Sequence, residues 1–116
     1  MDCNRNIEVL YKEPNKNPER RKIANTLEEM QNVVGGYIEI VGYKGALLIC
    51  NEEGKLRGLE PNISLGDDII CGSFFIAGDD YEKADFISLT ESQFEEFMKE
   101  FSNALQCERE LEEELE

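Results

Sequence analysis

The sequence contains no histidine among its 116 residues. Histidine is the commonest general base near neutral pH and the commonest metal ligand, so its absence excludes a Ser-His-Asp triad, a Cys-His pair and a histidine-based metal site. No serine lies in a Gly-x-Ser-x-Gly motif, and no glycine-rich segment leads into a helix as a phosphate-binding loop does. We therefore expect a protein that is not an enzyme, with no catalytic residues, no cofactor and no metal.

Long apolar segments are also missing. No run approaches the roughly 18 apolar residues that a membrane-spanning helix needs. The first residues, MDCNRNIEVLYKE, contain no basic segment followed by an apolar one, so they do not have the pattern of a signal peptide. These two absences predict a cytoplasmic protein that does not bind membranes.

Closely spaced cysteines are absent as well. The four cysteines, Cys3, Cys50, Cys71 and Cys107, lack the short spacings of a zinc site. Cys50 and Cys71 lie within apolar runs. We therefore predict that these two are buried, reduced thiols.

Basic residues are scarce in the second half of the chain. Residues 1–58 hold nine Lys or Arg and nine Asp or Glu, whereas residues 59–116 hold three and seventeen. All of the formal net charge of −14 therefore lies in the second half. Because direct nucleic-acid binding normally requires a basic surface, none is expected. The acidic half indicates either a solvated surface or one that attracts a basic partner or imitates a phosphate backbone.

The chain contains enough apolar residues to form one core. Its length fits one domain. We expect an α+β domain over residues 1–105, followed by an acidic extension, helical or frayed, over residues 106–116. Alternating apolar residues and turn signals predict five to six short strands of a mostly antiparallel sheet, at residues 6–12, 37–43, 46–51, 55–59, 68–78 and 86–89. Residues 13–22, 61–68 and 79–85 are expected to be loops.

Two helices are predicted. The first follows a cap at Asn25 or Thr26 and ends at Gly35 or Gly36. The second is a longer, amphipathic helix capped by Thr90, and its apolar stripe consists of Phe94, Phe97, Met98, Phe101 and Leu105. We expect both helices to pack on one side of the sheet. The strand at residues 68–78 is apolar on both faces, so it is expected to be central, and Gly72 within it indicates a bulge or a close backbone approach.

Four stretches together resemble a known family. They are NTLEEMQNVVGGYIEIV, LLICNEEGKLRGLEPN, DIICGSFFIAG and FISLTESQFEEFM. Their order and spacing are similar to those of the family of domain of unknown function 3846, from about Ile7 to Phe101. The resemblance implies a bacterial, phage or plasmid setting. It implies no reaction and no functional residues.

The charge distribution supports the first of two hypotheses. In it, the protein is a non-enzymatic acidic module of a phage or mobile element that binds a host protein with a basic surface. A counter-defence role, similar to that of an anti-CRISPR protein, or imitation of nucleic acid would suit such a module. The binding residues would be acids of the loop at residues 79–85 and of the extension: Asp79, Asp80, Glu82, Asp85, Glu108, Glu110, Glu112, Glu113 and Glu114.

The second hypothesis is a small-molecule site near the segment from Asn51 to Asn62. A hairpin turn at Asn51 to Lys55 explains the first part of this segment without any site. The remaining donors, Lys55, Arg57 and Asn62, are candidates for holding an anionic ligand. A compact apolar pocket with convergent polar groups would favour this hypothesis over the first.

Overall fold

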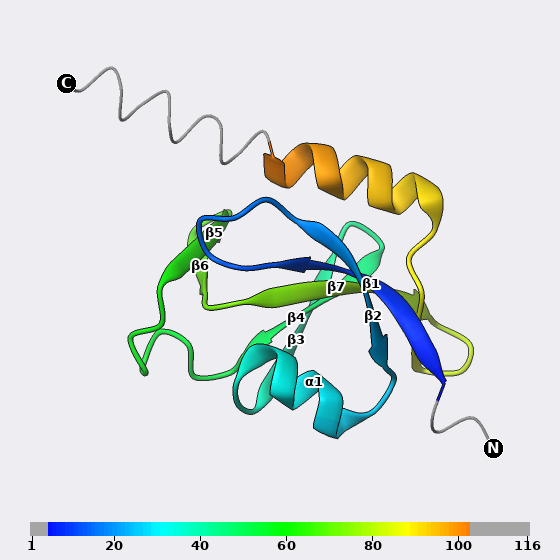
Figure 1. Ribbon diagram of the computed structural model, residues 1–116, viewed down its shortest axis with the longest axis horizontal. Helices are drawn as coiled ribbons and strands as arrows, with labels where there is room; N and C mark the ends of the chain where they lie inside the picture. Colours follow the sequence, from blue (N-terminus) through cyan, green and yellow to red (C-terminus); the bar gives the residue numbers. More distant parts are fainter. Residues whose placement is uncertain (1–4, 103–116) are drawn as a thin grey trace.

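The computed structural model describes residues 5–102. Its strands and first helix are β1 (Asn6–Lys12), β2 (Glu19–Ala24), α1 (Leu27–Val34), β3 (Ile38–Tyr43), β4 (Ala46–Asn51), β5 (Pro61–Leu65), β6 (Asp68–Cys71), β7 (Phe74–Asp80) and β8 (Asp85–Ile87). A second helix, here called the C-terminal helix, is described over residues 91–102 (Figure 1).

Six of the strands form one antiparallel sheet. The order is β2-β1-β7-β4-β3, and short β8 pairs with the far end of β7. Strands β5 and β6 form a separate antiparallel ribbon. The α+β class and the antiparallel sheet are therefore as predicted. Strand β7 is central, and its residues Phe74 to Ala77 are fully buried, as its apolar sequence indicates.

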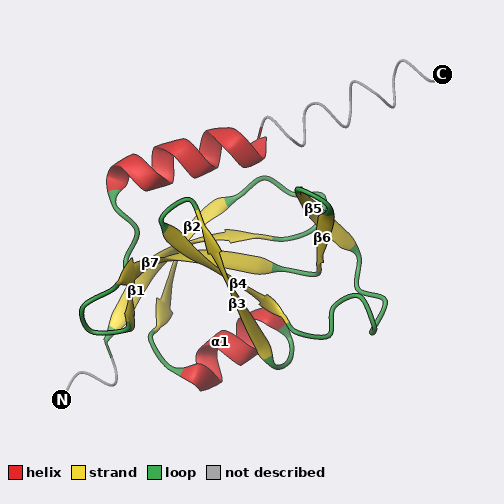
Figure 2. Ribbon diagram, turned by 180° about the vertical axis from the view of Figure 1, so that it is seen from behind, coloured by secondary structure: helices red, strands yellow, loops and turns green. Residues whose placement is uncertain are grey.

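The two helices cover opposite faces of the sheet, so the prediction that both pack on one side is wrong (Figures 1 and 2). One core lies between the sheet and the C-terminal helix and includes Leu48, Phe74 and Phe97. The other lies between the sheet and α1 and includes Met30 and Phe75. A central strand whose side chains are apolar on both faces requires a cover on each face, which explains the arrangement.

Strand β2 begins within residues 13–22, which the sequence predicts to be a loop, and continues to Ala24. It pairs with β1 in unbroken register from Asn6↔Ala24 to Tyr11↔Glu19. Strand β2 lacks the alternation of apolar and polar residues that indicates a strand, because only Ile23 within it is buried. The guanidinium groups of Arg20 and Arg21 lie 4.1 and 3.8 Å from the ring centroids of Phe94 and Tyr11. Long basic side chains thus cover aromatic surface at this edge.

Residues 52–58 form successive turns and not the return strand predicted at 55–59. Asn51 directs this path because its Oδ1 accepts a hydrogen bond from the Glu53 amide at 2.8 Å. Its Nδ2 donates to the Val34 carbonyl at 3.1 Å, at the end of α1. The chain then forms helix-like bonds such as Arg57 N to Glu53 O, at 2.9 Å. The segment folds back on itself before β5 begins.

The predicted strand at residues 68–78 is two strands, and the predicted loop at 61–68 contains β5. The break lies at Gly72, which has φ of 86°. A Cβ atom there would lie 2.8 Å from the Leu59 side chain, and the Gly72 amide donates to the Glu60 carbonyl at 2.8 Å. The close approach expected at Gly72 is confirmed, and it separates β6 from β7.

Helix caps agree with the sequence. Thr26 caps α1 by accepting from the Glu29 amide, and Gly35 ends it with φ of 80°. Thr90 Oγ1 accepts from the Gln93 amide at 3.2 Å, while Gln93 Oε1 accepts from the Thr90 amide at 3.0 Å. Phe94, Phe97 and Phe101 of the predicted stripe are buried. Leu105 and the predicted extension at residues 106–116 lie outside the described residues.

Candidate functional site

The acidic segment at residues 79–85 is a β-hairpin and not the loop that the sequence predicts. Asp79 and Asp80 end β7, Glu82 lies in the turn, and Asp85 begins β8. The register pairs Asp79 with Phe86 and Asp80 with Asp85. The hairpin lies at the same end of the molecule as the start of the C-terminal helix (Figure 1).

One of the four acids stabilises the fold. Asp85 accepts hydrogen bonds from the Phe86 amide at 2.7 Å and from Asn25 Nδ2 at 3.3 Å, and it forms an ion pair with Arg5 at 3.3 Å. These bonds, the one from the Phe86 amide above all, hold the pKa of the Asp85 carboxyl below its ordinary value. Asp85 thus ties the hairpin to the start of the chain and to the segment before α1.

The other three acids are available to solvent or to a partner. Within residues 5–102, Asp79, Asp80 and Glu82 form no ion pair. Asp80 accepts only from the Lys83 amide, at 3.2 Å, across the turn. Between Asp80 and Glu82 the turn exposes Tyr81, whose exposed fraction is 75%. Sequence reasoning missed Tyr81, although an aromatic residue inside an acidic segment is visible in the sequence.

The acids of the extension, Glu108, Glu110, Glu112, Glu113 and Glu114, lie outside the described residues. The C-terminal helix begins at the end of the molecule that holds the β7–β8 hairpin and runs toward the end that holds the β5–β6 ribbon (Figures 1 and 2). Its twelve described residues span about 18 Å at the rise of an α-helix. The last described residue of the helix therefore lies away from the hairpin.

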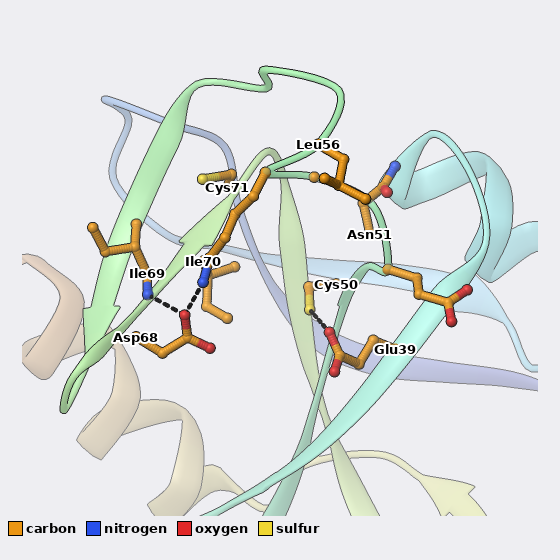
Figure 3. Close-up of a pocket in the computed structure, with 11 residues that line it drawn as sticks. Glu39, Cys50, Asn51, Leu56, Asp68, Ile69, Ile70 and Cys71 are labelled. Atoms are coloured by element: carbon orange, nitrogen blue, oxygen red, sulfur yellow. Dashed lines mark hydrogen bonds and ion pairs between the residues drawn. The ribbon is translucent and has the colours of Figure 1, made fainter.

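A pocket of about 340 Å³ lies where the main sheet meets the β5–β6 ribbon (Figure 3). Strands β3 and β4 contribute Glu39 and Cys50, and β6 contributes Asp68 and Cys71. The end of β4 and the turns that follow it close another side, with lining residues Asn51, Glu52, Gly54, Lys55 and Leu56. The second sequence hypothesis predicts a site in this region.

The lining of this pocket is acidic and its one cation is engaged. Lys55 pairs with Asp68, and their hydrogen bond raises the pKa of Lys55 and lowers the pKa of Asp68. Glu39 and Glu52 add two further carboxylates. Such a lining attracts a cationic group more than an anionic one.

Cys50 faces Glu39 in this pocket, with 4.0 Å between Sγ and Oε1 (Figure 3). Burial raises the pKa of the Cys50 thiol to about 11, and the charge of Glu39 adds to the effect. Cys50 and Cys71 are both free. Cys50 is buried as predicted, whereas Cys71 is only half-buried. The other two cysteines lie outside the described residues.

The three donors proposed for an anionic ligand do not converge. Lys55 lines the pocket just described, whereas Arg57 pairs with Glu53 at 3.6 Å and lines a separate hollow with Tyr37. Asn62 lines a third hollow. Its Nδ2 donates to the Gly72 carbonyl at 2.8 Å. The structure therefore does not combine these residues into one site.

Asn62 instead supports a buried lysine that sequence reasoning missed. Lys12, only 2% exposed, donates from Nζ to Asn62 Oδ1 at 2.8 Å and to the Glu13 carbonyl at 3.2 Å. Asn62 Nδ2 in turn donates to the Lys12 carbonyl at 3.0 Å. These bonds connect β1 with the β5–β6 ribbon. A lysine at a strand end carries no sequence signal of burial.

Residues 5–102 contain neither a candidate metal centre nor a candidate membrane-spanning helix. No three His, Cys, Asp or Glu side chains in this part of the chain are grouped so that they could hold a metal ion. No helix within the same residues has the length and apolar character needed to cross a membrane.

A family model with the description "Domain of unknown function (DUF3846)" matches residues 7–102. The match covers most of the chain and confirms the resemblance identified from the sequence. No curated protein and no solved structure matches the chain. This description carries no activity.

Proposed function

We propose a function for this chain, which belongs to the DUF3846 family: it is a non-enzymatic module that binds a partner protein with a basic surface. The β7–β8 hairpin makes the contact in this proposal. The observation that carries it is Tyr81, which is largely exposed between Asp80 and Glu82. A solvent-exposed aromatic ring contributes apolar contact area, and tyrosine is enriched at interfaces and among the residues that dominate binding energy.

The charge around Tyr81 supports a basic partner. Residues 59–102 hold eleven Asp or Glu and only two Lys or Arg. Of the hairpin acids, only Asp85 is used in an ion pair within the described residues. A surface of one sign raises the association rate with a partner of opposite sign. The glutamates at 108, 110, 112, 113 and 114 would extend this attraction.

The proposal includes a biological setting. The family resemblance implies a bacterial, phage or plasmid protein, and a module of a phage or mobile element would act on a host protein in the cytoplasm. A host defence protein with a nucleic-acid groove has the required basic surface, so counter-defence by imitation of a phosphate backbone, as in an anti-CRISPR protein, is the role we propose. The module itself binds neither nucleic acid nor membrane in this proposal.

The test is capture of a partner by the full chain from a bacterial lysate, followed by binding kinetics with the purified partner. Tyr81→Ala should weaken binding by about 2 kcal/mol or more, as loss of a central aromatic contact does. The double variant Asp79→Asn, Glu82→Gln should slow association.

The matched control is Glu95→Gln, Glu96→Gln, which removes the same charge from exposed positions on the C-terminal helix. If the hairpin makes the contact, this control changes the association rate less than the hairpin variant does. Equal effects of both double variants, together with no effect of Tyr81→Ala, would contradict a contact at the hairpin.

The pocket at the β5–β6 ribbon favours a second candidate function, small-molecule binding. Its volume of about 340 Å³ is within the range of ligand sites, which is roughly 300–1,000 Å³. The excess of carboxylates over its one lysine favours a ligand with a cationic group over the anionic ligand expected from the sequence. We keep this function second because the three donors predicted for a ligand, Lys55, Arg57 and Asn62, do not converge in this pocket.

Thermal unfolding with small probes tests this candidate. Agmatine and putrescine are the cationic probes, and citrate and inorganic phosphate are the anionic ones. A ligand of the folded state raises Tm with concentration. The effect of a cationic probe should vanish in Glu39→Gln and persist in Glu95→Gln. If only the anionic probes raise Tm, and Lys55→Met abolishes the effect, the anionic hypothesis is correct; if no probe acts, this pocket is not the site for these ligands.

A further inference from the structure

The two edges of the main sheet differ in kind. Within the described residues, β2 and β3 are the terminal strands of the order β2-β1-β7-β4-β3. Strand β2 begins Glu-Arg-Arg-Lys, and such charged residues protect an edge from pairing with another chain. Strand β3 has the sequence IEIVGY, with one charge, no proline and regular register along β4. An apolar, regular edge of this kind is a template for an added strand.

The hydrogen-bonding groups on the free side of β3 can be identified. The Tyr37 carbonyl accepts from the Glu52 amide at 2.9 Å, and the register pairs Ile38 with Asn51. Bonded and non-bonded pairs alternate in an antiparallel ladder, so residues 39, 41 and 43 bond to β4. The amides and carbonyls of Ile38, Ile40 and Gly42 therefore point to the free edge. Ile40 is also 49% exposed, although it is apolar.

The side chains along this edge define what would pair with it. Ile38 and Ile40 lie on the α1 face of the sheet, where they oppose Asn51 and Ile49 of β4, and Glu39 lies on the other face. An added strand would place apolar side chains beside the isoleucines and, one residue along, a basic side chain beside Glu39. A second copy of this chain fits poorly, because two chains of net charge −14 repel each other.

We propose that the free edge of β3 binds an extended segment of a partner, in which apolar and basic residues alternate, as an additional antiparallel or parallel strand. This inference rests on the proposed function, because the basic character of the partner comes from there. The partner would then contact this chain at two places: at the hairpin, and at β3 through backbone hydrogen bonds. Backbone pairing supplies affinity in such complexes, and the alternating side chains supply specificity.

The probe is a short synthetic peptide in which Lys alternates with Val, titrated into the full chain. Ile40→Pro removes one outward-pointing amide without changing the charge or the bonds between β3 and β4. It should weaken peptide binding at least about tenfold. The matched control is Ala24→Pro on β2, which also leaves the charge unchanged. The Asn25 amide bonds to the Arg5 carbonyl, which by the same alternation turns the Ala24 amide outward on the opposite edge.

Hydrogen exchange locates the contact. In the unchanged chain, the peptide should slow exchange of the Ile38, Ile40 and Gly42 amides. A peptide N-methylated on the amides of one edge, and a peptide with Glu in place of Lys, should both bind at least about tenfold more weakly. The N-methylated peptide tests the pairing even if Ile40→Pro does not fold.

Three outcomes would overturn the inference. In the first, the Lys-Val peptide binds equally to both proline variants and does not slow amide exchange in β3. The peptide would then bind by attraction to the acidic surface, without adding a strand. In the second, the chain forms a dimer that Ile40→Pro dissociates, which would make a second copy the occupant. In the third, the peptide does not bind at all. That result would leave the proposed function open to its own test, which uses the hairpin variants.

Discussion

At the scale of single residues, two asparagine side chains connect segments that are distant in the sequence. Asn51 bonds to both the Glu53 amide and the Val34 carbonyl, and Asn62 bonds to Lys12 and to Gly72. The sequence predicts polar turns at both places, but the partners lie up to 50 residues away. Sequence pattern therefore could not separate Asn62, which supports the fold, from a ligand-binding donor.

The first residue-scale prediction concerns Cys50. Burial raises the pKa of its thiol from 9.0 in the unfolded reference to about 11. Between these two pH values the thiol stays protonated in the folded state but loses its proton in the unfolded state. This deprotonation stabilises the unfolded state relative to the folded one. The contribution of this thiol to the free energy of unfolding is complete below pH 9 and is lost as pH rises to about 11.

Urea melts of the unchanged chain and of Cys50→Ala measure this contribution. The difference in free energy of unfolding between them should shrink as pH rises through that range. Because the thiolate is the reactive form, iodoacetamide should also modify Cys71 faster than Cys50 in the folded protein at neutral pH. Faster modification of Cys50, located by mass spectrometry, would be inconsistent with its burial.

At the scale of elements, the sequence predicted those that carry their own signals. The caps at Thr26 and Thr90, the apolar stripe on the C-terminal helix and the apolar run of β7 are local patterns. Strand β2 was missed because its order comes from pairing with β1 and from arginines that cover Phe94 and Tyr11. The return strand at residues 55–59 was predicted from turn residues alone, and contacts of Asn51 and Gly72 with distant segments overrode that local signal.

The element-scale prediction concerns the C-terminal helix. Phe101 is buried, with its ring centroid 5.6 Å from that of Phe74 and 6.2 Å from that of Tyr43. Phe101→Ala should lower the free energy of unfolding by about 3–5 kcal/mol, because it leaves a cavity between the helix and the sheet. The control is Lys99→Ala, on the exposed side of the same helix. It should change the free energy of unfolding by less than about 0.5 kcal/mol. A loss below about 1 kcal/mol for Phe101→Ala in denaturant melts would mean that the helix does not hold this face.

At the scale of the whole molecule, helices cover both faces of the sheet, so within residues 5–102 large apolar side chains reach solvent at only a few places. These places are the β7–β8 hairpin, β3 and the residue before it, the mouth of the pocket and the start of α1. The sequence located the acidic half of the chain correctly. It did not indicate that Tyr81 is exposed, nor which of the acids at the hairpin is used by the fold, because both depend on how β8 returns beside β7.

The extension supplies a prediction at this scale. The described part of the C-terminal helix already contributes Phe94, Phe97 and Phe101 to the core, so we expect the extension to add little to it. Deletion of residues 108–116 should therefore leave Tm nearly unchanged. The same deletion removes five units of net negative charge, so it should slow association with a basic partner at low salt. A fall in Tm of several degrees in a calorimetric scan would show that the extension stabilises the domain.

The salt dependence of the association rate with a captured partner tests the central claim most directly. Charged surfaces are screened over a Debye length of about 8 Å at physiological ionic strength. If the acidic hairpin attracts a basic partner, the on-rate should fall steeply as salt rises, and Asp79→Asn, Glu82→Gln should flatten that dependence. Tyr81→Ala should keep the slope and accelerate dissociation, because it removes a contact and not a charge. An on-rate that does not change with salt, and that is the same in the unchanged chain and in the hairpin variant, would contradict the account.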